Sequence, residues 1–210
     1  MLEAVRGRAR PYFEDAPPAH DWHHVQRVAA LAETLTDCYS KSVDERVVQL
    51  AVALHDVGRE REDRGEIEDH AIWGAREAGR ILRDVGADEE TIDRVRHCIR
   101  AHRYSNDVEP ETLEAEIVCD ADNLDALGAI GIARVFAYGG ELGQPIHDPA
   151  TSVADDETPA GKTQYNHVHK KILDLPARMY TDAGGELAAD RAAFVREYLE
   201  RFDAEVAGDA

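Results

Sequence analysis

Long apolar runs are absent from the sequence, which nowhere has the roughly 18 consecutive apolar residues that a membrane-spanning helix needs. Residues 1–13 carry arginines and acids instead of the apolar stretch of a signal peptide. We therefore expect a cytoplasmic protein that has no membrane partner.

Paired cysteines are also missing. Cys38, Cys98 and Cys119 are odd in number and widely spaced, and none of them belongs to a CxxC pair. This spacing argues against both a disulfide framework and a thiolate zinc site. We expect three buried or half-buried free thiols.

Lysine is scarce, because only four of the 24 basic residues are lysines, and 43 acidic residues give a formal net charge of −19. Such a surface repels the backbone of nucleic acids, which argues against a polymeric nucleic acid as substrate. An acidic surplus with few lysines suits a salt-rich cytoplasm, where salt screens the self-repulsion. We therefore expect the protein to come from a halophilic archaeon.

Alternating strand patterns are nearly absent, whereas apolar residues return every three or four positions. At 210 residues the chain is long enough for one buried core. We predict a single all-α domain over residues 1–210. We expect helices over residues 22–39, 44–56, 71–82, 88–102, 110–138, 163–180 and 186–206. The helix over 110–138 is expected to be interrupted or closely packed at Gly128 and Gly131.

The segment 139–161 lacks this periodicity and is rich in Gly, Pro, Asp and Thr. A loop of about 20 residues is unusual inside a compact domain and is commonly a lid, a binding loop or a mobile excursion. We predict a long loop here.

His55 and Asp56 follow an apolar helix in the string AVALHDVG, between Leu54 and Val57. Two polar side chains therefore lie where the pattern predicts burial, which is costly unless they are paired or bound to a metal. Taken alone, the pair is better explained as a histidine that caps the helix C-terminus beside a surface acid.

Three aspartates interrupt the apolar run EIVCDADNLDALGAIG at positions 120, 122 and 125. Aspartate inside a helix lowers helix stability, so these residues need a reason beyond solubility. A metal supplies one, because it compensates buried carboxylates and accepts mixed His and Asp ligands. Asp120 and Asp122 point about 200° apart on a helix, so both are not expected to bind one ion.

The strings HDWHHVQRV, ALHDVG, AHRYS, DADNLDALGAIGIARVF and NHVHKKILDLPARMYT resemble the HD-domain metal-dependent phosphohydrolases, in particular their small single-domain bacterial and archaeal branch. The resemblance covers roughly residues 18 to 205. It implies an orthogonal helical bundle that holds a divalent cation, such as Mn, Mg, Co, Ni or Fe. The ligands that it implies are His24, His55, Asp56 and Asp122, with Asp122 preferred over Asp120 by its place in the motif ADxL.

The resemblance also implies a possible second ion, for which the candidates are His70, His97 and His102, with Asp56 as the bridge. His97 is the weakest candidate, because it lies about 140° from His102 around their helix. Asp120 and Asp125 are candidates for residues behind the ligands. The remaining histidines, His20, His23, His147, His167 and His169, are not expected to bind metal.

The expected activity is hydrolysis of a small phosphorylated, nucleotide-like substrate by a metal-activated water, with Asp56 orienting that water or accepting its proton. Arg27, Arg59 and Arg103 lie beside the motifs and are candidates for binding phosphate. Two alternatives stay open: a di-iron oxygenase with the same fold, and a non-catalytic domain that senses a nucleotide.

Overall fold

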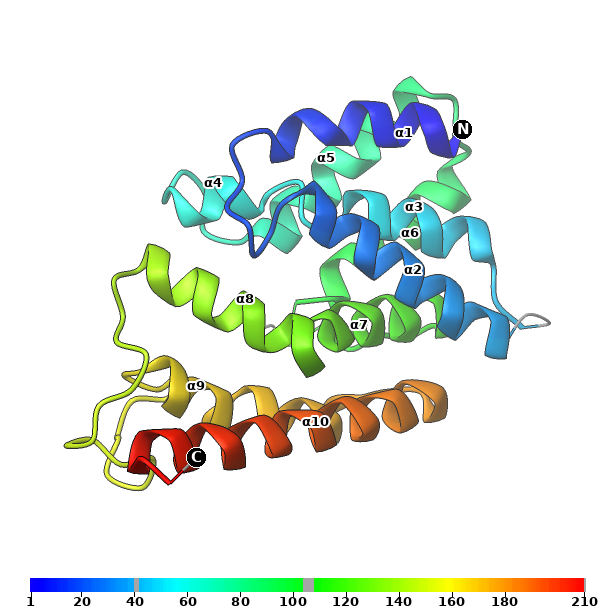
Figure 1. Cartoon of the computed structure of the whole chain (residues 1–210). Helices are drawn as coiled ribbons and strands as arrows, with labels where there is room; N and C mark the ends of the chain where they lie inside the picture. Colours follow the sequence, from blue (N-terminus) through cyan, green and yellow to red (C-terminus); the bar gives the residue numbers. More distant parts are fainter. Residues whose placement is uncertain (40–41, 104–107, 210) are drawn as a thin grey trace. The chain divides into compact units, whose positions relative to one another are not determined.

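The computed structural model describes residues 1–39, 42–103 and 108–209, and its regular structure is helical throughout these ranges (Figure 1). No strand occurs in them, which confirms the all-α prediction. The α-helices are α1 (Leu2–Ala9), α2 (Trp22–Cys38), α3 (Glu45–Leu54), α4 (Arg59–Asp63), α5 (His70–Asp84), α6 (Glu89–Ala101), α7 (Leu113–Asp125), α8 (Gly128–Glu141), α9 (Gln164–Lys170) and α10 (Asp182–Ala207), and the 3-10 helices are η1 (Arg10–Phe13) and η2 (Ile172–Arg178).

Aspartate side chains cap the helices that carry the candidate site. Asp21 accepts a hydrogen bond from the backbone N–H of His24 at 3.0 Å, and Asp69 accepts one from Ile72 at 2.8 Å. Asp44 and Asp88 do the same for α3 and α6. Each cap satisfies a backbone N–H that the first helical turn leaves without a partner. The caps therefore fix where the first turns of α2 and α5 begin.

The predicted helix over 110–138 is two helices, because the chain turns between α7 and α8. Gly128 has φ of +70°, a backbone conformation that side chains with a Cβ rarely adopt. A Cβ on Gly131 would lie 2.1 Å from the carbonyl oxygen of Ala126, so the turn also needs a glycine there. The predicted helix over 163–180 likewise divides into α9 and η2, which contains Pro176.

Three short elements were not predicted, namely α1, η1 and α4. Their sequences, LEAVRGRA, RPYF and RERED, are short, and α4 has no apolar residue at all. Hydrophobic periodicity gives no signal in segments of this length and composition.

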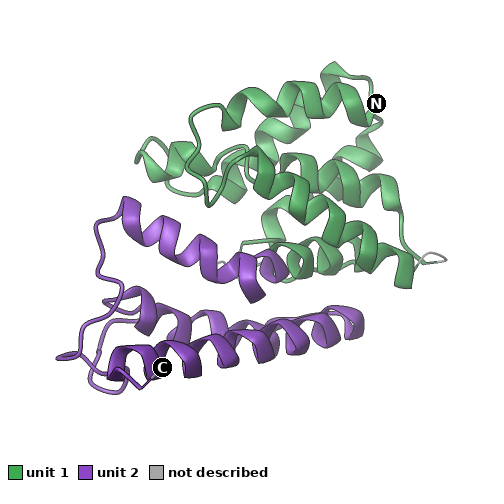
Figure 2. Ribbon diagram, viewed as in Figure 1, with its two compact units in different colours: residues 1–122 green, residues 123–210 purple. Residues whose placement is uncertain are grey.

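The chain divides into two compact units, residues 1–122 and residues 123–210 (Figure 2). In the first unit, α3 packs against α1, α2 and α6, and α5 packs against α6. Its core includes Leu35, Leu50, Leu54, Ile92 and Ile99, all fully buried. In the second unit, α10 packs against α8 and η2, and α9 packs against α8 and η2. The single domain over residues 1–210 stays a prediction.

The predicted loop follows α8 in the second unit and extends to the start of α9. Its centre is the buried carboxylate of Asp156, which accepts hydrogen bonds from the backbone N–H groups of Thr158 (3.0 Å) and Lys162 (2.7 Å) and from the Asn166 side chain (2.8 Å). The Lys170 ammonium group donates to the carbonyl oxygens of Asp156 and Thr158. The loop is thus tied to α9 by hydrogen bonds.

Two of the three cysteines are buried, as expected, and burial raises the pKa of the Cys98 thiol to about 12. Cys38 is exposed, so the expectation of burial was wrong for this residue. It is the last residue of α2, beyond the buried stretch that ends at Thr36. Among the described helices, none has the length and apolar character required to cross a membrane.

Candidate metal centre

The first candidate ligands lie at the start of α2 and at the end of α3. His24 belongs to the first turn of α2, three residues after the Asp21 cap. His55 is the C-cap residue directly after α3, and Asp56 follows it. The side chains of both histidines are fully buried, and Asp56 is only 5% exposed. The burial expected from the flanking apolar residues is therefore present.

His24, His55 and Asp122 form one cluster in the first unit. The His24 Nε2 atom lies 3.2 Å from His55 Nε2 and 3.3 Å from Asp122 Oδ1, and His55 Nε2 lies 3.8 Å from the same oxygen. Ligands at about 2.0–2.2 Å from one ion are separated from each other by about 3.0–3.6 Å. Two of the three separations fall within this range and the third lies just above it, so the three donors are close enough to share a single cation.

Asp56, His70 and His102 form a second cluster. The Asp56 Oδ1 atom lies 3.5 Å from both His70 Nε2 and His102 Nε2, and the two imidazole nitrogens are 3.4 Å apart. Of the three candidates for a second ion, the structure therefore brings together His70 and His102.

Asp56 joins the two clusters through its two oxygen atoms. Oδ2 faces His24 and His55, each at 3.6 Å, whereas Oδ1 faces His70 and His102. A carboxylate that presents one oxygen to each of two groups of ring nitrogens has the arrangement of a bridging ligand.

The hydrogen bonds of the ring Nδ1 atoms show why this arrangement suits cations. His102 Nδ1 lies 2.6 Å from the Ile99 carbonyl oxygen, and His70 Nδ1 lies 2.5 Å from a Glu62 carboxylate oxygen. A neutral imidazole carries one N–H, so donation at Nδ1 leaves a lone pair at Nε2. The two Nε2 lone pairs then face each other and the Asp56 carboxylate, which a shared cation would stabilise. The residues present therefore fit a metal.

The pKa values of the buried groups follow from the same surroundings. Burial lowers the pKa of His55 to about 4, so this imidazole is neutral and able to bind a metal at neutral pH. Burial alone would raise the pKa of Asp56, but the histidine rings within 3.6 Å of its two oxygen atoms hold it well below its ordinary value. The carboxylate is therefore ionised.

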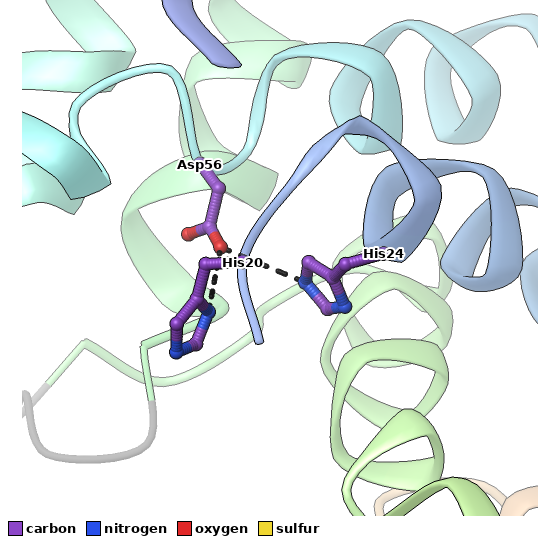
Figure 3. Close-up of side chains that lie close together, drawn as sticks. All are labelled: His20, His24 and Asp56. Carbon is purple, nitrogen blue, oxygen red and sulfur yellow. Dashed lines mark ion pairs between the residues drawn. The ribbon is translucent and has the colours of Figure 1, made fainter. Parts of the chain in front are cut away.

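His20 was not expected at the site, yet its ring lies beside Asp56. Its Nδ1 atom is 3.6 Å from Asp56 Oδ2, and with His24 and Asp56 it forms a third cluster (Figure 3). His20 precedes the Asp21 cap and lies outside any helix, so helical periodicity could not place it. The only sequence signal was its position in HDWHHVQRV, four residues before His24.

Glu62 was also missed. It lies on α4 and contacts both His70 and Arg103. In the sequence it is one acid of the charged string RERED, which gives no sign that it points towards a histidine.

Three other predicted residues, His97, Asp120 and Asp125, lie outside the clusters found in the described residues. The His97 Nε2 atom accepts a hydrogen bond from the Glu111 N–H at 3.0 Å, and His97 belongs to none of the clusters found in the described residues. Asp120 is fully buried but is likewise outside those clusters. Asp125 pairs with Arg134 at 3.1 Å within the second unit.

Two of the three candidate arginines, Arg59 and Arg103, have acidic partners in the first unit. Arg59 pairs with Asp63 at 3.2 Å, and Arg103 pairs with Glu62 at 2.9 Å and with Asp69 at 2.8 Å. Arg27 is half-buried on α2, one turn after His24. Their role in binding phosphate stays a prediction.

Comparison with known families gives a match to the HD domain over residues 21–127, about half of the chain. This range contains the clustered residues His24, His55, Asp56, His70, His102 and Asp122. The chain belongs to the HD-domain family. The recognition of the family from its motifs is thereby confirmed.

Whole-length relatives support this membership. The uncharacterized protein YpgQ of Bacillus subtilis is 31% identical over 212 aligned residues, which cover 99% of this chain and 95% of YpgQ. The crystal structure of YpgQ in complex with ADP has a TM-score of 0.78 at 27% identity and covers 100% of both chains. An HD-superfamily hydrolase from Bacillus thuringiensis has a TM-score of 0.74 at 30% identity and covers 97% of this chain and 95% of its own.

The protein is thus an all-α HD-superfamily member with buried His and Asp clusters of the kind that bind metal. The relatives named above come from Bacillus species, and they do not support an origin in a halophilic archaeon.

Proposed function

We propose that this protein is a metal-dependent phosphohydrolase that acts on a small, nucleotide-like phosphorylated substrate. The observation that carries the proposal is the buried carboxylate of Asp56, which presents one oxygen to each of two groups of histidines. Its HD-superfamily relatives include a protein described as a hydrolase, and the similar YpgQ was crystallised with ADP.

Two sets of residues would hold divalent cations. His24, His55, Asp56 and Asp122 are the proposed ligands of the first ion, and Asp56, His70 and His102 are those of the second. Bound divalent cations lower the pKa of a coordinated water and neutralise phosphate oxygens. Mn, Mg, Co, Ni and Fe are all compatible with mixed nitrogen and oxygen ligands.

Asp56 is the proposed catalytic residue. A general base works best when its pKa is close to the working pH, whereas the surrounding histidines hold the pKa of Asp56 well below its ordinary value. This carboxylate is therefore better suited to orient the attacking water than to retain its proton.

Phosphate binding is proposed for Arg27, Arg59 and Arg103. Arg59 and Arg103 are paired with acids, which a substrate phosphate would have to displace or share. Arg27 belongs to α2, one turn after His24. Asp120 and Asp125 remain proposed supports behind the ligands.

A substrate panel tests the proposal directly. The panel contains dNTPs, NTPs, nucleoside monophosphates and p-nitrophenyl phosphate, each with Mn²⁺, Mg²⁺, Co²⁺ or Ni²⁺ in high salt. We expect metal-dependent release of phosphate or pyrophosphate from at least one nucleotide. His55→Ala should abolish this turnover, whereas His97→Ala, outside the clusters, should retain it. Flat turnover across the panel by the wild-type protein would contradict the proposal.

The same preparation separates the two alternatives. A di-iron oxygenase would contain iron and form a product only when O₂ is supplied. A nucleotide-sensing domain would bind a nucleotide without turnover, and its biological effect would survive His55→Ala. Colourless protein that contains Mn or Mg and hydrolyses a nucleotide would exclude both.

A further inference from the structure

Three ligand histidines are oriented by acceptors at Nδ1, and one of the acceptors differs from the others. His55 Nδ1 lies 2.8 Å from the carbonyl oxygen of Val52, and His102 Nδ1 lies 2.6 Å from that of Ile99. In both cases the acceptor is the backbone carbonyl three residues earlier. His70 Nδ1 instead lies 2.5 Å from Oε2 of Glu62, a side chain eight residues earlier.

The position of each histidine in its helix explains the difference. His55 and His102 are the C-cap residues of α3 and α6, next to the last carbonyl groups of a helix, which lack intrahelical partners. His70 is instead the first residue of α5. At this end a helix has N–H groups without intrahelical partners, and no carbonyl group of α5 precedes His70. An acceptor for its Nδ1–H must therefore come from elsewhere, and α4 provides Glu62.

Glu62 is held in turn by Arg103. The Nη1 atom of Arg103 lies 2.9 Å from Glu62 Oε1 and 2.8 Å from Asp69 Oδ2. Asp69 caps α5 and directly precedes His70, and Arg103 directly follows His102. One guanidinium group therefore links the carboxylate that orients His70, the start of the helix that carries His70, and the segment that carries His102.

We propose that Glu62 is a positioning residue for the second metal site and that Arg103 holds it in place. This inference rests on the proposed metal-dependent function. Glu62 fixes the tautomer and ring orientation of His70, and its negative charge makes the imidazole a stronger donor to a cation. Glu62 contacts Arg59, His70 and Arg103 and, among the described residues, none of the ligands His24, His55 and Asp122 of the first site. Loss of Glu62 should therefore weaken the second site selectively.

The proposal also gives Arg103 a role other than binding phosphate. A planar guanidinium can approach two carboxylates with fixed geometry, which a lysine ammonium on a flexible stem does not reproduce. Arg103→Lys should therefore weaken the second site although it preserves the charge. KM at saturating Mn²⁺ distinguishes the two roles proposed for Arg103, because KM rises if the guanidinium also holds the phosphate and keeps the wild-type value if it only holds Glu62.

The test compares Glu62→Gln with Glu60→Gln in the full-length protein. Glu60 is a matched control because it belongs to the same helix and pairs with Arg64, away from the histidines. Metal-free protein is titrated with Mn²⁺, and bound ions are counted by elemental analysis and free ions by electron paramagnetic resonance. Loss of a carboxylate behind a ligand histidine costs about 10- to 100-fold in metal affinity.

We expect wild-type protein and Glu60→Gln to bind two ions, and Glu62→Gln to retain the first ion and bind the second at least about tenfold more weakly. Melting temperatures of the metal-free proteins show whether each variant folds. Should Glu62→Gln unfold, Arg103→Lys provides the same titration with the carboxylate intact. Wild-type affinity at both sites, or equal loss at both, would overturn the inference.

Failure of this inference and failure of the proposed function give different results. Two ions in the wild-type protein without turnover of any nucleotide would contradict the phosphohydrolase and leave the role of Glu62 to be decided by the titration. A wild-type protein that hydrolyses nucleotides with a single bound ion would overturn the role of Glu62 alone.

Discussion

At the scale of single residues, the choice between Asp120 and Asp122 shows what helical geometry can decide. The two side chains point to different sides of α7, so only one can face a given ion. The structure places Asp122 Oδ1 3.3 Å from His24 Nε2, whereas Asp120 is fully buried outside the clusters. This arrangement agrees with the preference for Asp122, which came from its position in the motif.

Neutralising each aspartate in turn tests this preference. Asp122→Asn should lower the affinity for the first ion by about 10-fold or more and turnover at least as much, because the site loses a charged ligand. Asp120→Asn should retain the bound metal. Metal content after gel filtration and the rate with saturating Mn²⁺ are the measurements. Retention of metal by Asp122→Asn together with its loss from Asp120→Asn would reverse the assignment.

His20 and His97 show how little residue identity alone says about the direction of a side chain. His97 was a candidate because the family resemblance implies a histidine at about this place, and its ring nitrogen accepts a hydrogen bond from the Glu111 backbone. His20 was set aside, yet it lies 3.6 Å from Asp56. An irregular turn has no periodicity, so the direction of a side chain in it cannot be calculated from spacing.

At the scale of elements, helix ends determine the site. The candidate ligands His55 and His102 lie at the ends of α3 and α6, whereas His24 and His70 lie in the first turns of α2 and α5. Capping residues and apolar periodicity made the boundaries of these helices predictable within a few residues. The bend at Gly128 and the division of 163–180 were harder to locate, because both depend on contacts that sequence spacing does not reveal.

The conformation of the loop after α8 depends on the carboxylate of Asp156. The side-chain hydrogen bond from Thr158, together with those from Asn166 and the backbone of Lys162, holds the pKa of Asp156 below its ordinary value. A carboxyl group whose pKa is lower in the folded state stabilises the fold at pH values above its unfolded pKa. That stabilisation is lost as the pH falls towards the folded pKa.

Asp156→Asn should therefore lower the melting temperature by several degrees near neutral pH, because the amide cannot accept all of these hydrogen bonds. The difference from wild type should shrink as the pH falls from about 6 to about 3. Melting curves followed by circular dichroism over this range measure it. Asp155→Asn, an exposed neighbour, is the control, and equal melting of Asp156→Asn and wild type near pH 6 would contradict the prediction.

At the scale of the whole molecule, the large excess of acidic residues affects the stability of the fold. The sequence carries 43 acidic and 24 basic residues. Self-repulsion among the excess acids destabilises the folded chain in dilute salt, and added salt screens it. This argument depends on the charge alone and holds whatever the source of the protein.

We expect the melting temperature to rise by several degrees between about 0.1 M and about 1 M KCl, where the screening length falls from about 10 Å to about 3 Å. Potassium sulfate at equal ionic strength is the control, because screening predicts a similar rise, whereas salting-out predicts a much larger one. An unchanged or lower melting temperature in KCl would contradict the prediction.

The sequence by itself determined the all-α class, most helix boundaries, the HD family and the order of the candidate ligands. These properties depend on local periodicity, on capping residues and on motifs that can be read along the chain. Only the tertiary structure decided that Asp56 faces both clusters, that His20 and Glu62 lie beside them, and that His97 does not. Such contacts join residues far apart in the chain or in irregular turns, and their geometry is set by packing, which spacing does not encode.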